Sequence, residues 1–225
     1  MHLPALLEFL EGLSQNNNRP WFVLHKPAYD ILREEFLALM TGLIDDVRAF
    51  DKDLGPIDPK KSALRIYRNL RFSRDKTPFK TNFAGAIGDR AQRGFLPSYY
   101  FHIDAAGMLM AGGGIYRPEK TVLTNIRRHI AAHPERLTKV LKGTRFRKTY
   151  GGLTEEESLV NPPQGFAADT PHIDVIRMKH FFGIVEIDLR KHPPQYLRAE
   201  VARLFRDVHP LVAFLREASR TKGTD

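Results

Sequence analysis

The longest helical pattern in the sequence, from Ala28 to Phe50, constrains the fold more than any other feature. Its apolar residues recur at steps of three or four positions, and most of the charged residues fall off that stripe. The stripe consists of Tyr29, Leu32, Phe36, Leu39, Leu43, Val47 and Phe50. This spacing predicts a long amphipathic α-helix, followed by a loop that contains Gly55, Pro56 and Pro59.

Shorter helical and strand patterns alternate along the rest of the chain. Helices are predicted over residues 3–14, 118–132, 134–141 and 195–219, with a short helix capped by Asn18 and a kink at Pro210. Strands are predicted at 64–67, 82–88, 98–104, 108–112 and 180–188, and residues 143–171 are expected to be irregular. This order predicts one α+β domain over residues 1–225, with a mainly antiparallel sheet packed with long helices at both chain ends. A two-lobed single domain is the alternative.

The composition is that of a globular protein with a core, since 42% of the 225 residues are hydrophobic and 10% are aromatic. No cysteine is present, which excludes disulfides, thiolate metal sites and cysteine nucleophiles. The N-terminal sequence lacks the charged region and cleavage site of a signal peptide. No uncharged apolar run approaches the roughly eighteen residues of a membrane span. We therefore expect a soluble cytoplasmic protein without a membrane partner.

A single stretch, Lys60–Lys80, carries most of the net positive charge. It contains eight Lys or Arg residues and one acid, Asp75, whereas the whole chain has a net charge of +9. One cationic segment in an otherwise nearly neutral chain indicates an anion-binding site. Residues 68–81 fit neither helical nor strand spacing, and we expect them to form an ordered loop whose arginines converge.

The ligand predicted for this segment carries phosphate or carboxylate groups, because arginine presents a planar fork of donors to such oxygens. The predicted ligand-binding residues of the segment are Arg65, Arg68, Arg71, Ser73, Lys76 and Lys80. Asp75 is a candidate general base, metal ligand or arginine-orienting group. The favoured interpretation of Asp75 is an ion pair with Arg71, Arg74 or Lys76, since a carboxylate among cations makes a poor base.

A second wall of the same site is predicted in Gly112–Pro118, with the sequence GGGIYRP. Its predicted ligand-binding residues are Gly113, Gly114, Tyr116 and Arg117. Glycines admit a ligand close to the backbone, and a following helix offers free N–H groups to an anion. The segment matches no nucleotide-binding motif, so a turn that needs positive φ is the favoured interpretation.

His129 and His133 have the i, i+4 spacing of paired metal ligands. However, the segment reads HIAAH and lacks the glutamate of the HExxH motif, and no third ligand is evident. The sequence therefore predicts no metal site, and it assigns neither a cofactor nor a catalytic residue.

Four segments together carry a family resemblance. They are NNRPWF (Asn17–Phe22, followed by Lys26 and Tyr29), RIYRNLRFSRDKTPFK (Arg65–Lys80), YYFHI (Tyr99–Ile103) and GGGIYRP (Gly112–Pro118). In this order they resemble the family catalogued as domain of unknown function 2461, over about Leu6 to Leu215. The resemblance implies one domain, and it does not indicate which activity, if any, the protein has. Two departures, Asn69 for an aspartate and Phe79 for a tyrosine, weaken an acid–base catalyst more than an anion-binding protein.

Three functions remain open on this sequence. The first, which we favour because the arginines share one loop with Pro, Phe and Ser, is a binding or catalytic site for a small anionic ligand. The second is nucleic-acid binding by the same segment, with Tyr67 or Phe72 stacking on a base. The third is docking to an acidic partner protein. The sequence indicates neither a reaction nor an oligomeric state.

Overall fold

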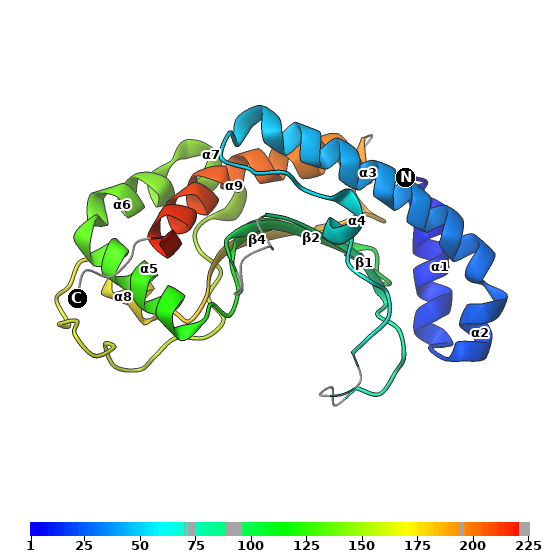
Figure 1. Cartoon of the computed structure of the whole chain (residues 1–225), viewed down its shortest axis with the longest axis horizontal. Coiled ribbons are helices and arrows are strands. Elements are labelled where there is room, and N and C mark those ends of the chain that lie inside the picture. The colour runs from blue at the N-terminus through cyan, green and yellow to red at the C-terminus, as the bar shows by residue number, and fades with distance from the viewer. Residues whose placement is uncertain (70, 72–74, 89–95, 194–195, 221–225) are drawn as a thin grey trace. The chain divides into compact units, whose positions relative to one another are not determined.

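The computed structural model describes residues 1–69, 71, 75–88, 96–193 and 196–220. These residues form the helices α1 (Leu3–Gln15), α2 (Arg19–Leu24), α3 (Lys26–Phe50), α4 (Pro59–Ser62), α5 (Lys120–Ala132), α6 (Pro134–Lys142), α7 (Thr144–Tyr150), α8 (Ile173–Arg177) and α9 (Leu197–Arg220), and the strands β1 (Asn82–Ile87), β2 (Ser98–Asp104), β3 (Met108–Ile115) and β4 (Phe181–Asp188). The strands form one antiparallel sheet in the order β1-β2-β3-β4. Figure 1 shows helices at both ends of the chain, which confirms the predicted α+β class.

The chain divides into two compact units, each built from three segments. The first unit comprises Met1–Ile87, Tyr100–Ala111 and Glu186–Arg203, and the second comprises Gly88–Tyr99, Gly112–Val185 and Leu204–Asp225. Strands β2, β3 and β4 and helix α9 each contribute residues to both units. The single domain predicted over residues 1–225 therefore stays a prediction.

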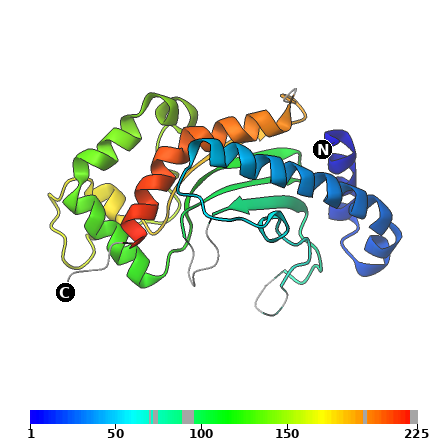
Figure 2. The same cartoon turned by 45° about the horizontal axis from the view of Figure 1, so that its top comes forward.

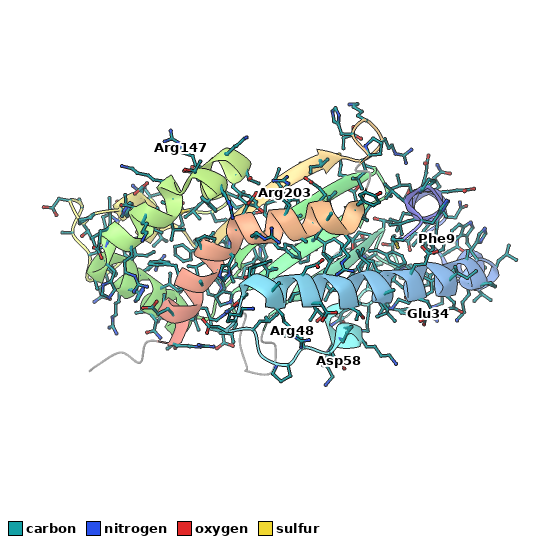
Figure 3. The ribbon with its side chains drawn as sticks, turned by 90° about the horizontal axis from the view of Figure 1, so that it is seen from above. Phe9, Glu34, Arg48, Asp58, Arg147 and Arg203 are labelled. Atoms are coloured by element: carbon teal, nitrogen blue, oxygen red, sulfur yellow. The ribbon has the colours of Figure 1, made fainter. Side chains whose placement is uncertain are left out.

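The N-terminal helices of the first unit follow the sequence signals closely. The side-chain oxygen of Asn18 accepts a hydrogen bond from the Trp21 N–H at 3.0 Å and caps α2, as predicted. Helix α3 begins at Lys26 with Pro27 in its first turn, where proline costs no hydrogen bond. The predicted stripe is buried at Leu32, Phe36, Leu39, Leu43 and Val47. Exposed residues such as Glu34 and Arg48 lie on the outer side of α3 (Figure 3).

The buried side of α3 packs against the sheet through aromatic rings. The ring of Phe36, fully buried, lies 5.4 Å from that of Phe83 in β1 and 5.6 Å from that of Phe101 in β2. Gly85 in β1 leaves room for Met40 of α3, whose sulfur a Cβ at Gly85 would overlap. These contacts place α3 across one face of the β1 and β2 strands within the first unit.

The ends of β3 and β4 in the second unit approach so closely that glycine is required. A Cβ at Gly112 would overlap the backbone oxygen of Gly183, and one at Gly114 would overlap that of Phe181. Gly114 also has φ +139°, which side chains rarely tolerate. Gly113 packs against Val208 and Val212 of α9. Strand β3 therefore runs to Ile115, beyond its predicted end at 112.

The prediction of irregular structure over 143–171 is wrong for residues 144–150, which form α7. Phe146 is almost fully buried, and the Tyr150 hydroxyl donates a hydrogen bond to the Leu204 carbonyl at 2.7 Å. The Thr149 hydroxyl donates to the carboxylate of Asp207 at 2.8 Å. Tertiary contacts with α9 thus stabilise α7. This helix is too short and too polar to show a helical spacing of apolar residues in the sequence.

The part of the chain that the structure describes contains no helix that is both long enough and apolar enough to cross a membrane.

Candidate basic-hairpin site

The basic segment folds back on itself between α4 and β1. We call its described residues, 63–69, 71 and 75–80, the basic hairpin. Its two arms are joined by backbone hydrogen bonds from Arg68 N–H to the Pro78 carbonyl (2.9 Å) and from Lys80 N–H to the Ile66 carbonyl (2.7 Å), and its first arm meets β1 through a bond from Leu64 N–H to the Ala84 carbonyl (2.8 Å). Isolated antiparallel bridges pair Tyr67 with Phe79 and Ala63 with Gly85. In Figures 1 and 2 its described residues extend past the edge strand β1, away from α3.

Asn17, between α1 and α2, fixes the base of the basic hairpin. Its side-chain amide donates to the Phe79 carbonyl at 3.0 Å, and its side-chain oxygen accepts the Phe79 N–H at 3.1 Å. The Arg68 guanidinium donates to the same carbonyl at 3.2 Å. A short turn between two helices therefore holds a segment more than sixty residues away in the sequence.

An aromatic stack supports Tyr67. The ring of Phe22, which is buried in α2, stacks on that of Phe79 with the centroids 4.1 Å apart. The ring of Tyr67 lies 5.3 Å from that of Phe79 and 5.8 Å from that of Phe22, while 55% of Tyr67 remains exposed. Tyr67 is thus a fixed ring with one side open to solvent.

The Asp75 carboxylate lies 3.1 Å from the guanidinium of Arg68, an arginine that was not among the predicted partners. Of the predicted partners, Arg74 lies outside the described residues, and pairing with Arg71 or Lys76 stays a prediction. The N–H and hydroxyl of Thr77 donate to the Asp75 carboxylate at 2.9 and 2.8 Å. These two hydrogen bonds, with the charge of Arg68 added, hold the pKa of Asp75 below its ordinary value. Asp75 is therefore an anionic structural group of the basic hairpin.

The other predicted cations of the basic hairpin occupy different environments. Arg65 is exposed. Arg71 and Lys76 are exposed, and Lys80 is half-buried at the hairpin base. Ser73 lies outside the described residues. The structure thus brings Arg68 and Lys80 to the base, and the convergence of the remaining cations on one ligand stays a prediction.

The predicted second wall belongs to the second unit. Gly113 and Gly114 are strand residues of β3 whose missing side chains serve packing. Tyr116 is half exposed, and its ring stacks on the His180 imidazole with the centroids 4.7 Å apart. The Arg117 guanidinium lies 5.3 Å from the centre of the Tyr116 ring. Tyr116 and Arg117 therefore form a cluster around His180, and a shared site with the basic hairpin stays a prediction.

The paired histidines do come together, in the second unit. The His129 and His133 rings lie 4.7 Å apart, and His129 Nε2 lies 3.9 Å from a carboxylate oxygen of Glu217. The Arg136 guanidinium donates two hydrogen bonds of 2.6 Å to the same carboxylate. The described residues contain no group of three or more side chains placed to hold a metal ion. The arrangement is that of an ion pair that borders a buried imidazole.

Two residues that sequence reasoning did not single out lie on the strand face of β2 opposite α3. The Tyr100 hydroxyl lies 3.0 Å from His102 Nδ1, and both side chains are half-buried. Their i, i+2 spacing in YYFHI places them on one side of the strand. Burial raises the pKa of Tyr100. Burial also lowers the pKa of His102, an effect that the nearby charges of Asp104 and Glu186 oppose.

Because the pKa of His102 is lower in the folded chain, we expect its contribution to stability to be complete above its ordinary pKa, about 6.5. That contribution should be lost as the pH falls through the folded value. Urea unfolding at pH 7.5 and 5.0 should show a smaller loss of stability for His102→Gln than for the parent. His192→Gln, at an exposed imidazole, controls for the removal of a histidine. Equal losses for His102→Gln and the parent would contradict the expectation.

The fold and this site define an α+β protein with a basic hairpin clamped onto an aromatic stack beside its sheet. The chain belongs to a family described as "Conserved hypothetical protein (DUF2461)", whose model matches residues 5–214. The match confirms the resemblance carried by the four sequence segments. Comparison with curated proteins and with solved structures found no match. The family description names no activity, so function has to be argued from the site.

Proposed function

We propose that the protein binds single-stranded nucleic acid through the basic hairpin. The observation that carries the proposal is the environment of Tyr67. This residue is 55% exposed, and its ring packs against the rings of Phe22 and Phe79. Single-strand binders place aromatic rings where bases stack on them and cations where the phosphate backbone runs. A ring fixed in advance loses little entropy when a base stacks on it.

The charges around Tyr67 suit a phosphate backbone. Arg65 precedes Tyr67 by two residues on the same side of an extended arm, and both are exposed, whereas Ile66 between them is buried. Lys60 and Lys61 of α4 are exposed a few residues upstream. Asp58 caps this short helix, and Figure 3 shows it at the helix start. A chain of phosphates that follows the first arm would meet these cations in turn.

The small-ligand hypothesis has less support from this geometry. Arg68 is the one half-buried arginine among those described in the basic hairpin, and it is engaged by Asp75 and the Phe79 carbonyl. The remaining described cations of the segment, apart from Lys80, are exposed along the arms. Exposed cations beside an exposed ring fit an extended polyanion better than an enclosed metabolite. We also propose that the protein is cytoplasmic, because single-stranded nucleic acids are abundant in the cytoplasm.

The test measures binding of a fluorescent single-stranded oligonucleotide over a range of salt concentrations. Tyr67→Ala should weaken binding about ten-fold at every salt concentration, because base stacking is worth roughly 1–3 kcal/mol. Arg65→Ala should reduce the log–log salt slope by about 0.7, the value for one phosphate of a single strand. The ring and the cation thus leave different signatures.

Matched controls lie elsewhere on the first unit. Tyr196 is 68% exposed, and Arg48 is exposed on α3 (Figure 3), so Tyr196→Ala and Arg48→Ala should keep the parent affinity and slope. Saturable binding of ATP or tripolyphosphate without oligonucleotide binding would favour the small-ligand hypothesis instead. Association with an acidic protein that survives nuclease treatment, again without oligonucleotide binding, would favour partner docking.

A further inference from the structure

The second unit contains a buried arginine that has no acidic partner among the described residues. Arg127 of α5 is only 9% exposed. One terminal nitrogen of its guanidinium donates to the Met178 carbonyl at 3.1 Å, and its Nε–H is buried without an acceptor. Burial lowers the pKa of Arg127. Buried charges in proteins are normally paired with an opposite charge, so a guanidinium in this state has unused capacity for an anion.

His180, two residues after Met178, has a second unused donor. It is 4% exposed, and its Nδ1 lies 3.0 Å from the backbone nitrogen of Arg117, which donates to it. Since Nδ1 is the acceptor, the ring proton is on Nε2. Nε2 is buried and has no hydrogen-bond partner in the described residues. The backbone N–H of Arg117 thus fixes the tautomer of the His180 ring, and the ring N–H at Nε2 is a buried donor without an acceptor among the described residues.

The backbone that fixes this tautomer is itself strained. Arg117 has φ +48°, a left-handed conformation that residues other than glycine adopt rarely. That conformation accompanies the hydrogen bond from its N–H to His180, and the Tyr116 ring stacks on the imidazole. Strained backbone of this kind concentrates at ligand sites, where the surrounding structure maintains it.

The charges around the two donors also favour an anion. Arg117 and Lys179 lie 4.0 and 3.0 Å from Glu157, the one acid in ion-pair range of this cluster among the described residues. The hydrogen bond and charge of Lys179, with a smaller effect of the Arg117 charge, lower the pKa of Glu157. Arg117 and Lys179 share the Glu157 carboxylate, and Arg127 has no carboxylate partner among the described residues. The cluster therefore keeps an excess of positive charge.

We propose that the second unit binds a small oxyanion, a phosphate or a carboxylate, between the Nε–H of Arg127 and the Nε2–H of His180. An oxyanion with two acceptor oxygens satisfies both orphaned donors and supplies the missing counter-charge. Arg127 of α5 donates to the carbonyl of Met178, and His180 follows Met178 by two residues, so the two donors come from adjoining parts of the second unit. This site uses residues of the second unit alone and is independent of nucleic-acid binding by the basic hairpin.

The experiment compares thermal unfolding in buffers without oxyanions and with increasing inorganic phosphate or malonate. The parent should gain stability along a saturating single-site curve with at least one of the two. Arg127→Met should bind that anion at least about ten-fold more weakly, because it loses a charged hydrogen bond. His180→Asn, whose side-chain oxygen can still accept the Arg117 N–H, should also weaken binding. The preferred anion identifies the ligand class as phosphate or carboxylate.

Arg128→Met, at the exposed neighbour of Arg127, should keep the parent response. In oxyanion-free buffer, Arg127→Met should be as stable as the parent or more stable, since it removes an unpaired buried charge. A nitrogen-15 spectrum should show the His180 Nε2–H resonance moving with the anion. No saturating response of the parent, or equal responses of Arg127→Met and Arg128→Met, would overturn the proposal.

Discussion

Gly112→Ala is expected to lower the free energy of unfolding by about 3 kcal/mol or more, the upper range for overpacking a core. The new Cβ would overlap the Gly183 backbone oxygen, so β3 and β4 would have to separate. A backbone oxygen in a sheet cannot turn aside as the end of a flexible side chain can. Urea unfolding followed by circular dichroism measures the change.

Gly152→Ala is the matched control in the same unit. Apart from Gly152 itself and its two chain neighbours, no residue has an atom within 4 Å of the position that the new Cβ would take, and the φ of Gly152 is outside the left-handed region. We expect a change of less than about 0.5 kcal/mol there, as for most surface substitutions. Equal effects of Gly112→Ala and Gly152→Ala would show that the close approach of β3 and β4 is not needed for stability.

Phe22→Ala is expected to cost about 3 kcal/mol of stability and to weaken oligonucleotide binding in the folded protein. The stability loss follows from emptying a buried site, since Phe22 is 3% exposed and its ring meets those of Phe79, Tyr29 and Tyr67. The binding loss follows because Tyr67 would lose part of its support. Chemical unfolding and fluorescence anisotropy, both under conditions where the variant is folded, measure the two effects.

Val23→Ala, at the next residue, separates the two consequences from a general effect on α2. Val23 is 69% exposed, so its truncation should change neither stability nor binding appreciably. A Phe22→Ala protein that is destabilised but binds like the parent would show that Tyr67 does not depend on its aromatic support.

Helix and strand periodicity predicted most elements, because the buried stripe of α3 and the alternating pattern of β2 reflect one covered face each. Helices α4, α7 and α8 were missed, since four to seven residues give no periodicity. The end of β3 was missed for a different reason. A run of glycines reads as a turn, and only the neighbouring strand reveals that the backbone needs their small size.

The positive charge of the candidate site could be predicted from the sequence, but the arginine that pairs with Asp75 could not. The sequence located the cationic segment, but the register of the basic hairpin decides which arginine meets Asp75. Pairing of Arg68 with Pro78 brings that arginine close to the acid. Likewise Asn17 caps no helix and contacts a residue far along the chain, so no local pattern announces it. Arg127 and His180 are recognisable only by their burial and their missing partners.

The strand-like contacts at the two outer strands have a consequence for solubility. The first arm of the basic hairpin bonds to β1 through Leu64 and Ala84, and Thr154 bonds to β4 through the Phe182 carbonyl at 2.8 Å and the Ile184 N–H at 3.2 Å. Open strand edges recruit strands from other molecules and seed aggregates. The protein occupies part of each edge with its own irregular segments, which hinders self-association along the sheet.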